Sequence, residues 1–165
     1  MPNISLYNRQ KTLEYADKWA LSRNPRYYDF SEIGGDCTNF ASQCIYAGSG
    51  IMNFTPTHGW YYVNSFNRSP SWTAVAFLYN FLVTNSYKGP FAQVCDISKI
   101  ELGDLIQLGN SSGRFYHSLI LTSLNGQPGE DTIYISTHTM DSHNRPLNSY
   151  IYDRIRFLHI EGVYK

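Results

Sequence analysis

A cysteine that follows two glycines and an aspartate is the feature of this 165-residue sequence best suited to chemistry. The Gly-Gly-Asp-Cys run at positions 34–37 leads into a predicted helix from Cys37 to about Ala47, which Gly48 ends. Free N–H groups and the helix dipole at such a helix start stabilise a thiolate, lower the thiol pKa and can hold an oxyanion. We therefore expect Cys37 to be a nucleophile, and Cys44, two turns further on, to lie in the core.

A cysteine nucleophile needs a proton carrier, and His117 has a suitable setting. It opens a predicted strand over residues 117–122, whose apolar positions 119–121 would anchor it at the rim of a sheet. From there its ring can face the helix start and exchange a proton with Cys37. The alternative is a surface histidine at the edge of a hairpin.

A third group should orient the ring of His117 and set its tautomer. His138 ends the next predicted strand, residues 132–138, and the Asn-Gly-Gln-Pro-Gly run between the two strands predicts an antiparallel hairpin. Because the end of the second strand lies beside the start of the first, we expect His138 to be this group. Asp141 and Asn144 are the alternatives.

Helices are predicted through the first half of the chain. An apolar stripe along positions 13–20 predicts a helix that fades near Asn24, because the proline after it disfavours helical backbone. Ser71 is the predicted N-cap of a further helix. Residues 49–70, between the second and third helices, predict an irregular aromatic loop.

Strands are predicted in the second half. One further strand covers residues 104–108, and residues 150–160 offer one or two more. Helices followed by antiparallel strands predict the α+β class. No repeat or linker divides the chain, so we expect one domain over residues 1–165.

Composition narrows the classes of function. Thirteen basic and thirteen acidic residues give zero net charge, which argues against a nucleic-acid binder. No apolar run approaches the ~20 residues of a membrane-spanning helix, and the first residues lack the pattern of a secretory signal. The three cysteines have no zinc-site spacing, so we expect no metal and no other cofactor. Aromatic residues make up 16% of the chain, which suits either a groove for sugars and peptides or a large core.

These motifs together resemble the putative amidase domain family, a branch of the NlpC-like, papain-like cysteine hydrolases. The Asp-Cys-Thr-Asn-Phe run at 36–40 and the His-Ser-Leu-Ile run at 117–120 match its helix start and its histidine strand. Gly103-Asp104 matches the strand before the histidine, with Ile100 in place of a leucine. Stretches 60–62, 67–72 and 138–147 are more specific to the amidase branch, and the resemblance runs from about Tyr7 to the end.

The resemblance implies a papain-like fold, with N-terminal helices packed on a C-terminal antiparallel sheet, and amide hydrolysis through an acyl-enzyme. Cys37 would attack the carbonyl, His117 would move the proton, and His138 would orient His117. The N–H of Cys37, helped by the hydroxyl of Tyr27 or Tyr28, would stabilise the oxyanion. The residues expected to contact substrate are Asp36, Tyr28, Trp60, Tyr61, Trp72, Ser118 and Asp141, although Trp72 also suits the core.

The implied substrate is bacterial peptidoglycan, cut at the N-acetylmuramoyl–L-alanine bond. A stem-peptide endopeptidase or an acyltransferase with the same Cys-His pair is the first alternative, and a non-catalytic wall-binding module is the second. A redox role is disfavoured because Cys37 and Cys44 would lie about 10.5 Å apart along the helix. We expect the protein to act at the cell wall, either secreted or released as a phage endolysin, with a wall-binding domain in a longer parent chain.

Overall fold

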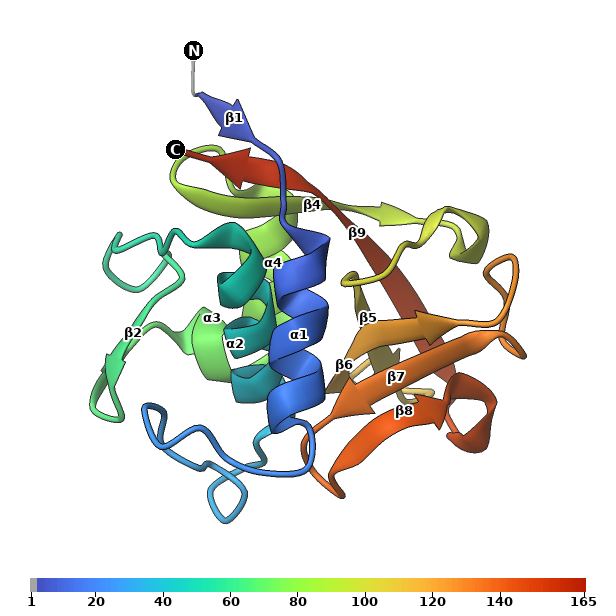
Figure 1. The fold of residues 1–165 in the computed structure, drawn as a ribbon. Coiled ribbons are helices and arrows are strands. Elements are labelled where there is room, and N and C mark those ends of the chain that lie inside the picture. Colours follow the sequence, from blue (N-terminus) through green and yellow to red (C-terminus); the bar gives the residue numbers. More distant parts are fainter. Residues whose placement is uncertain (1–2) are drawn as a thin grey trace.

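The structure is a computed structural model that describes residues 3–165. Within these residues, seven strands form one antiparallel sheet in the order β1-β9-β5-β6-β7-β8, and β4 also pairs with β9 (Figure 1). The strands are β1 (Ile4–Ser5), β4 (Gly89–Cys95), β5 (Leu105–Gly109), β6 (Phe115–Leu124), β7 (Ile133–Thr137), β8 (Ser142–Pro146) and β9 (Arg154–Tyr164).

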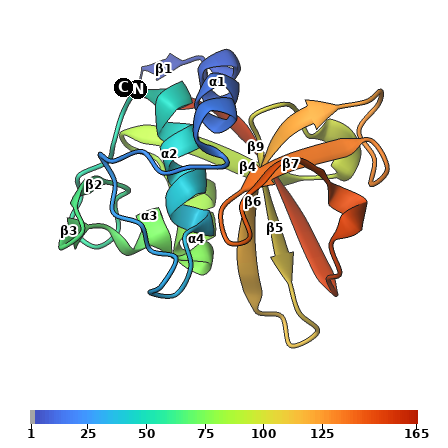
Figure 2. The same ribbon diagram turned by 60° about the horizontal axis from the view of Figure 1, so that its bottom comes forward.

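The helices gather on one side of this sheet (Figure 2). They are α1 (Arg9–Trp19), α2 (Cys37–Ser49), α3 (Pro70–Thr73) and α4 (Val75–Thr84). A short hairpin of β2 (Tyr62–Asn64) and β3 (Asn67–Arg68) lies outside the main sheet, and 3-10 turns cover Ile97–Lys99 and Leu147–Ser149. The predicted α+β class, with helices followed by antiparallel strands, is confirmed.

Three predicted helix boundaries need correction. Helix α1 ends at Trp19, before the predicted limit near Asn24. Helix α2 runs through Gly48 to Ser49 and is capped by Gly50, which takes the left-handed conformation with φ of 69°. Gly48 lies where α1 packs against α2, and a Cβ there would stand 2.2 Å from Thr12 Oγ1. The predicted helix after Ser71 is divided into α3 and α4 at Ala74, and the Ser71 hydroxyl donates to the Gly59 carbonyl instead of capping a helix.

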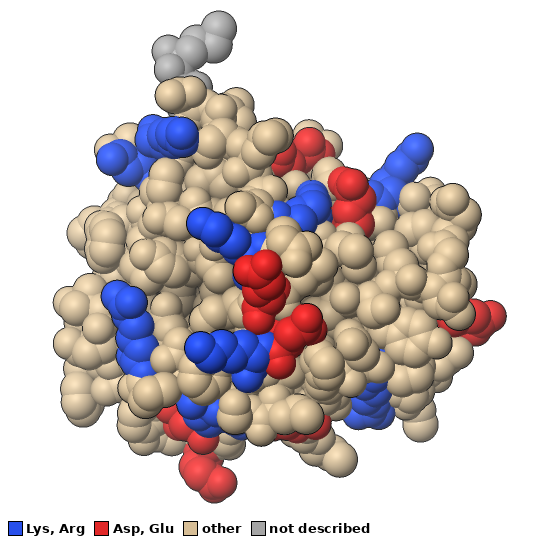
Figure 3. Space-filling view, viewed as in Figure 1, with Lys and Arg blue, Asp and Glu red and all other residues tan. Residues whose placement is uncertain are grey.

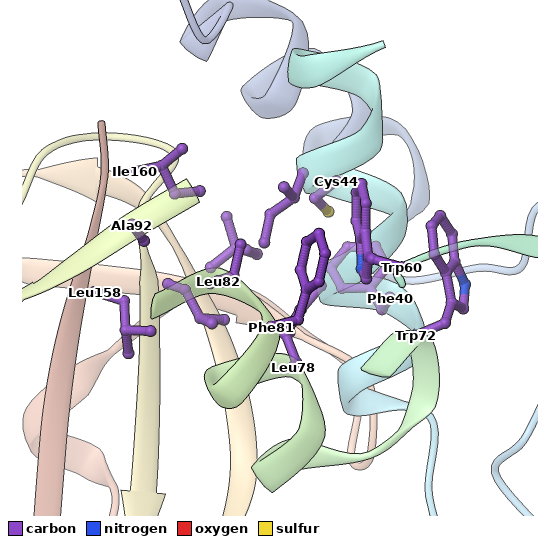
Figure 4. Packing of buried hydrophobic residues seen from close by; sticks show 14 of the residues in the cluster. Phe40, Cys44, Trp60, Trp72, Leu78, Phe81, Leu82, Ala92, Leu158 and Ile160 are labelled. Carbon is purple, nitrogen blue, oxygen red and sulfur yellow. The ribbon is translucent and has the colours of Figure 1, made fainter. Parts of the chain in front are cut away.

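The main core fills the space between the helices and the sheet. Figure 4 shows side chains from α2, α4 and β9 meeting there, among them Phe40, Leu78 and Leu158. Cys44 is fully buried in this cluster, as predicted. Each large apolar side chain buried in this way stabilises the fold by about 2 kcal/mol, so α2 is held firmly against the sheet.

A second apolar cluster covers the opposite face of the sheet. Leu119 and Leu121 of β6 belong to it, whereas Ile120 belongs to the core under the helices. Side chains therefore alternate along β6, as they must in a strand. This alternation decides which residues of β6 face the helix layer.

Charges of both signs are interspersed over the face shown in Figure 3. Within residues 3–165, no helix has the length and apolar character needed to cross a bilayer.

Candidate active site

Cys37 is the first residue of α2 and lies where the helix layer meets the sheet. The two preceding glycines have φ of 84° and 101°, conformations that favour glycine and let the chain turn sharply into the helix. Cys37 is mostly buried, but it lines two hollows of about 470 and 280 Å³. The nucleophile predicted from the sequence is thus the first residue of a helix and borders open space.

The protonation state of Cys37 differs from the expectation. Burial raises the pKa of the Cys37 thiol, although the backbone N–H of Ser118 and the hydroxyl of Thr38 act in the opposite direction. The charge of Asp36 raises the pKa further. Desolvation therefore outweighs the helix start, and the resting cysteine is a neutral thiol.

His117 lines the smaller hollow together with Cys37. It lies on β6, opposite Leu108 of β5, and its ring faces the ring of Tyr150 at 5.7 Å between centroids. Burial, helped by the positive charge of Arg145, lowers the pKa of His117 to about 4. A neutral imidazole and a neutral thiol thus border the same space.

His138 does not contact His117, which corrects the expected third member. Its Nδ1 lies 2.5 Å from Asp36 Oδ2, and its Nε2 lies 2.8 Å from the Trp19 carbonyl oxygen. The ring also stacks on Phe40 at 4.1 Å between centroids. Both ring nitrogens are therefore engaged on the helix side of the sheet.

The strand register explains this outcome. Ile120 of β6 pairs with Ser136 of β7, so position 138 lies opposite Ser118. Residues opposite each other point to the same face, and the neighbouring His117 points to the other. The hairpin brings the end of β7 beside the start of β6, as predicted, but His138 and His117 point to opposite faces of the sheet.

The two alternatives for the third member also bind elsewhere. The carboxylate of Asp141 accepts two hydrogen bonds from Arg23, at 2.7 and 3.0 Å. Asn144 Oδ1 accepts one from the Thr122 hydroxyl at 2.7 Å. Within residues 3–165, the ring of His117 makes no hydrogen bond. The ring is instead restrained by packing against the ring of Tyr150.

Asp36 is fully buried, so the expectation that it contacts substrate is not met. Its Oδ1 accepts hydrogen bonds from the Phe30 N–H at 2.9 Å and from Asn39 Nδ2 at 2.8 Å, while Oδ2 faces His138. A carboxylate with this many internal partners organises the chain around it. Asp36 holds the turn that precedes Cys37.

Ser118 is also buried and has no access to substrate. Its hydroxyl lies 3.0 Å from Thr38 Oγ1 and accepts a hydrogen bond from Gln107 Nε2 at 3.2 Å. These contacts tie the first turn of α2 to β5 and β6. Ser118 therefore positions the start of α2, which bears Cys37.

The expected aromatic groove is not formed by the tryptophans. Trp60 and Trp72 are fully buried in the main core, and their Nε1 atoms donate to Ser42 Oγ and Asn39 Oδ1. Tyr61 packs on an exposed phenylalanine at position 54. Trp60 and Trp72 therefore belong to the packing of the helix layer, whereas Tyr61 is half-buried and lines neither of the hollows that Cys37 borders.

The two tyrosines expected to help the oxyanion pack on other rings. Tyr27 lies against Trp72 and Tyr62, and Tyr28 lies against Phe30. In the part of the chain that the structure describes, neither lines the two hollows that Cys37 borders. The backbone N–H groups at the start of α2 remain as the candidate oxyanion donors.

Several residues at the two hollows were not found by sequence reasoning. Tyr150 and Arg145 line the smaller hollow, and Arg114 and Arg156 line the larger one. Arg145 falls in stretch 138–147, which gave it no assigned role, and the other three lie outside the motifs, each on a different strand or loop. Within residues 3–165, no three His, Cys, Asp or Glu side chains gather as metal ligands would.

Comparison with known proteins places the chain in a family. The family described as "Putative amidase domain" matches residues 6–160. The chain is also 36% identical over 121 residues to the uncharacterized protein YhbB of Bacillus subtilis (strain 168). That match covers 71% of this chain, and this chain spans 37% of the relative's length. No solved structure matches the chain significantly. Because the family match runs through nearly all helices and strands and includes both Cys37 and His117, the chain belongs to the putative amidase domain family.

Proposed function

We propose that the chain is a cysteine amidase in which Cys37 is the nucleophile and His117 carries the proton. One observation supports this most strongly: both side chains line the same hollow of about 280 Å³. A cysteine at the first turn of a helix and a histidine on an adjoining antiparallel strand are the arrangement of papain-like, NlpC-like hydrolases. We propose that the whole chain has the papain-like, NlpC-like fold.

The reaction begins from the neutral pair. The imidazole of His117 takes the proton of the Cys37 thiol as the sulfur attacks the amide carbonyl carbon. Moving this proton during attack avoids a free thiolate in a site where burial disfavours charge. The oxygen of the tetrahedral intermediate accepts hydrogen bonds from N–H groups at the start of α2.

The intermediate then collapses to products. The carbon–nitrogen bond breaks, His117 returns the proton to the leaving amine, and the acyl group stays on sulfur as a thioester. Water, deprotonated by His117, attacks the thioester carbonyl and releases the carboxylic acid and the free thiol. Each atom of substrate and water is accounted for without a cofactor.

His138 acts in this proposal as a positioning residue. It restrains Asp36, which in turn holds the turn before Cys37. Tyr150 restrains the ring of His117 by packing. This assignment replaces the expected hydrogen bond between the two histidines.

We propose bacterial peptidoglycan as the partner and the N-acetylmuramoyl–L-alanine bond as the bond cut, with the protein acting at the cell wall. The family description supports amide hydrolysis. A stem-peptide endopeptidase or an acyltransferase remains the alternative, since all three reactions share the thioester. A non-catalytic wall-binding module is disfavoured because Cys37 and His117 border one hollow.

The test compares the purified protein with two variants on purified peptidoglycan. Cys37→Ala removes the nucleophile, and Cys95→Ala is the matched control because Cys95 lies on β4. We expect turbidity to fall with wild type and Cys95→Ala, and not with Cys37→Ala. Full lysis by Cys37→Ala would contradict the proposed mechanism.

Mass spectrometry of the products identifies the reaction. A free lactyl carboxylate with a new L-alanine amine means a muramoyl amidase, and a new amine within the stem means an endopeptidase. A mass gain equal to an added amine means an acyltransferase. A folded wild-type protein that releases no product would contradict peptidoglycan as the substrate.

A further inference from the structure

The larger hollow beside Cys37 carries positive charge. It has a volume of about 470 Å³ and lies between the start of α4 and the loop that joins β5 to β6. Elements α4 and β6 lie side by side at this place (Figure 2). Arg114 and Arg156 line the hollow, and its lining contains no acidic residue. A ligand here meets two positive charges on one flank of the nucleophile.

Arg156 is held rigidly in this wall. Its guanidinium lies between the rings of Tyr79 and Phe115, at 3.6 and 3.8 Å from the two centroids. Its Nε and Nη2 both donate to Gln107 Oε1, at 2.9 and 2.6 Å. A guanidinium fixed in this way loses little conformational freedom when it binds a ligand.

Gln107 is fixed in turn. Its Nε2 donates to the Val75 carbonyl at 3.0 Å and to Ser118 Oγ at 3.2 Å. The hydroxyl of Ser118 also touches Thr38, the second residue of α2. Arg156 is thus connected through two side chains to the helix turn that bears Cys37, so the charge and the nucleophile keep a set separation.

Both arginines of the hollow lack a counter-ion among the residues that the structure describes. Within residues 3–165, Arg114 and Arg156 form no ion pair. Burial lowers the pKa of Arg156, and no carboxylate opposes that effect. A half-buried, unpaired cation is costly to the folded protein, and a bound anion would relieve that cost.

The start of α4 adds positive electrostatic potential to the same hollow. This helix spans Val75–Thr84, and no side chain caps its first turn. Residues 74–77 line the hollow, so the free N–H groups of the first turn lie at its edge. Helix and arginines together form an environment for one negatively charged group.

We infer that this hollow binds a carboxylate of the amide substrate, with Arg156 as its main contact and Arg114 as a second one. The inference rests on the proposed function in placing the substrate carbonyl at Cys37. It specifies the substrate as an acidic amide, with a free carboxylate on the flank of Cys37 away from His117.

The first test uses two alkylating reagents that differ mainly in charge, iodoacetate and iodoacetamide. In each case the sulfur of Cys37 bonds to the CH₂ carbon, iodide leaves with the bonding electron pair, and the thiol proton passes to solvent. The rate at which each reagent alkylates Cys37 is measured by peptide mapping. We expect the iodoacetate-to-iodoacetamide rate ratio to fall about five-fold in Arg156→Gln and less in Arg114→Gln.

Arg154→Gln is the matched control, because Arg154 is exposed on the same strand and does not line the hollow. It should leave the ratio unchanged, and added salt should lower the ratio in wild type. An equal ratio in wild type and a folded Arg156→Gln overturns the inference, as does failure of both reagents to modify Cys37. If Arg156→Gln does not fold, the exposed Arg114→Gln decides by the same measure.

The second test uses soluble muropeptides with their carboxylates either free or converted to carboxamides. We expect wild type to cleave the free form with a kcat/KM about ten-fold higher, and Arg156→Gln to lose this preference. Cleavage of both forms at equal rates would overturn the carboxylate site while the amidase stands. A charge-dependent alkylation ratio without cleavage of any muropeptide would reject the amidase and keep the site.

Discussion

His138 Nδ1 lies 2.5 Å from Asp36 Oδ2, and this buried contact joins the end of β7 to the residue before Cys37. The other ring nitrogen faces the Trp19 carbonyl, which can only accept a hydrogen bond. Nε2 must therefore carry a proton, and one more proton lies between Nδ1 and the carboxylate. The pair stabilises the turn that positions Cys37.

We predict that breaking this pair destabilises the fold. His138→Ala removes the histidine from the buried Asp36 carboxylate, which keeps its hydrogen bonds from Phe30 and Asn39 and has the Arg23 guanidinium at 3.6 Å. We expect a loss of about 1.5–3 kcal/mol in unfolding free energy, the range for a hydrogen bond to a charged group. Urea unfolding followed by circular dichroism measures it. His143→Ala is the control, because the exposed His143–Asp17 pair should contribute about 0–1 kcal/mol. A change below 1 kcal/mol for His138→Ala would contradict the assigned positioning role.

The pH dependence of activity follows from the two shifted groups. The pKa of His117 is lowered to about 4, so its ring is neutral above that pH. The pKa of Cys37 is raised above 9.0, so its thiol stays protonated up to alkaline pH. We expect kcat/KM to rise through about pH 4, stay level, and change again only above pH 9. If kcat/KM instead rose through about pH 6.5, the lowered pKa assigned to the buried His117 would be contradicted.

We predict that Trp60 and Trp72 matter for stability and not for substrate binding. Each is fully buried, so replacement by alanine leaves a cavity and should cost about 3–5 kcal/mol. Thermal and urea unfolding measure this, and KM of the folded fraction should stay unchanged. Phe66→Ala is the control because Phe66 is fully exposed, and it should change stability by less than about 0.5 kcal/mol.

Asp104, part of the Gly-Asp motif, should also prove structural. Its buried carboxylate accepts hydrogen bonds from Arg9 at 2.7 Å and from the Ile160 N–H at 2.9 Å, and lies 2.8 Å from His159 Nδ1. Asp104→Ala leaves these donors without an acceptor, and we expect the free energy of unfolding to fall by about 3–5 kcal/mol. Asp17→Asn, at an exposed position, serves as the control. Normal stability with abolished cleavage would instead assign Asp104 to the chemistry.

Sequence reasoning succeeded where the signal was local. The turn before Cys37 and the apolar periodicity after it predicted the helix start of α2 at the observed residue. The hairpin of β6 and β7 was predicted from turn residues between two apolar runs. It missed the short strands β1, β2 and β3, and also β4, whose pairing partner β9 is distant in the chain. It also missed β8, which pairs with the neighbouring β7 but is polar and lacks the apolar alternation of a strand.

The sequence by itself determined that helices precede most of the antiparallel strands, that a cysteine starts a helix and that a histidine lies on an antiparallel strand. These depend on residues close together in the chain, whose periodicity and turn chemistry act locally. The tertiary structure alone decided the face on which His138 lies, since a shift of one residue in strand register turns every side chain over. It alone decided the neutral state of Cys37 and the place of Arg156 beside it, because desolvation and packing depend on all the elements that close around a residue.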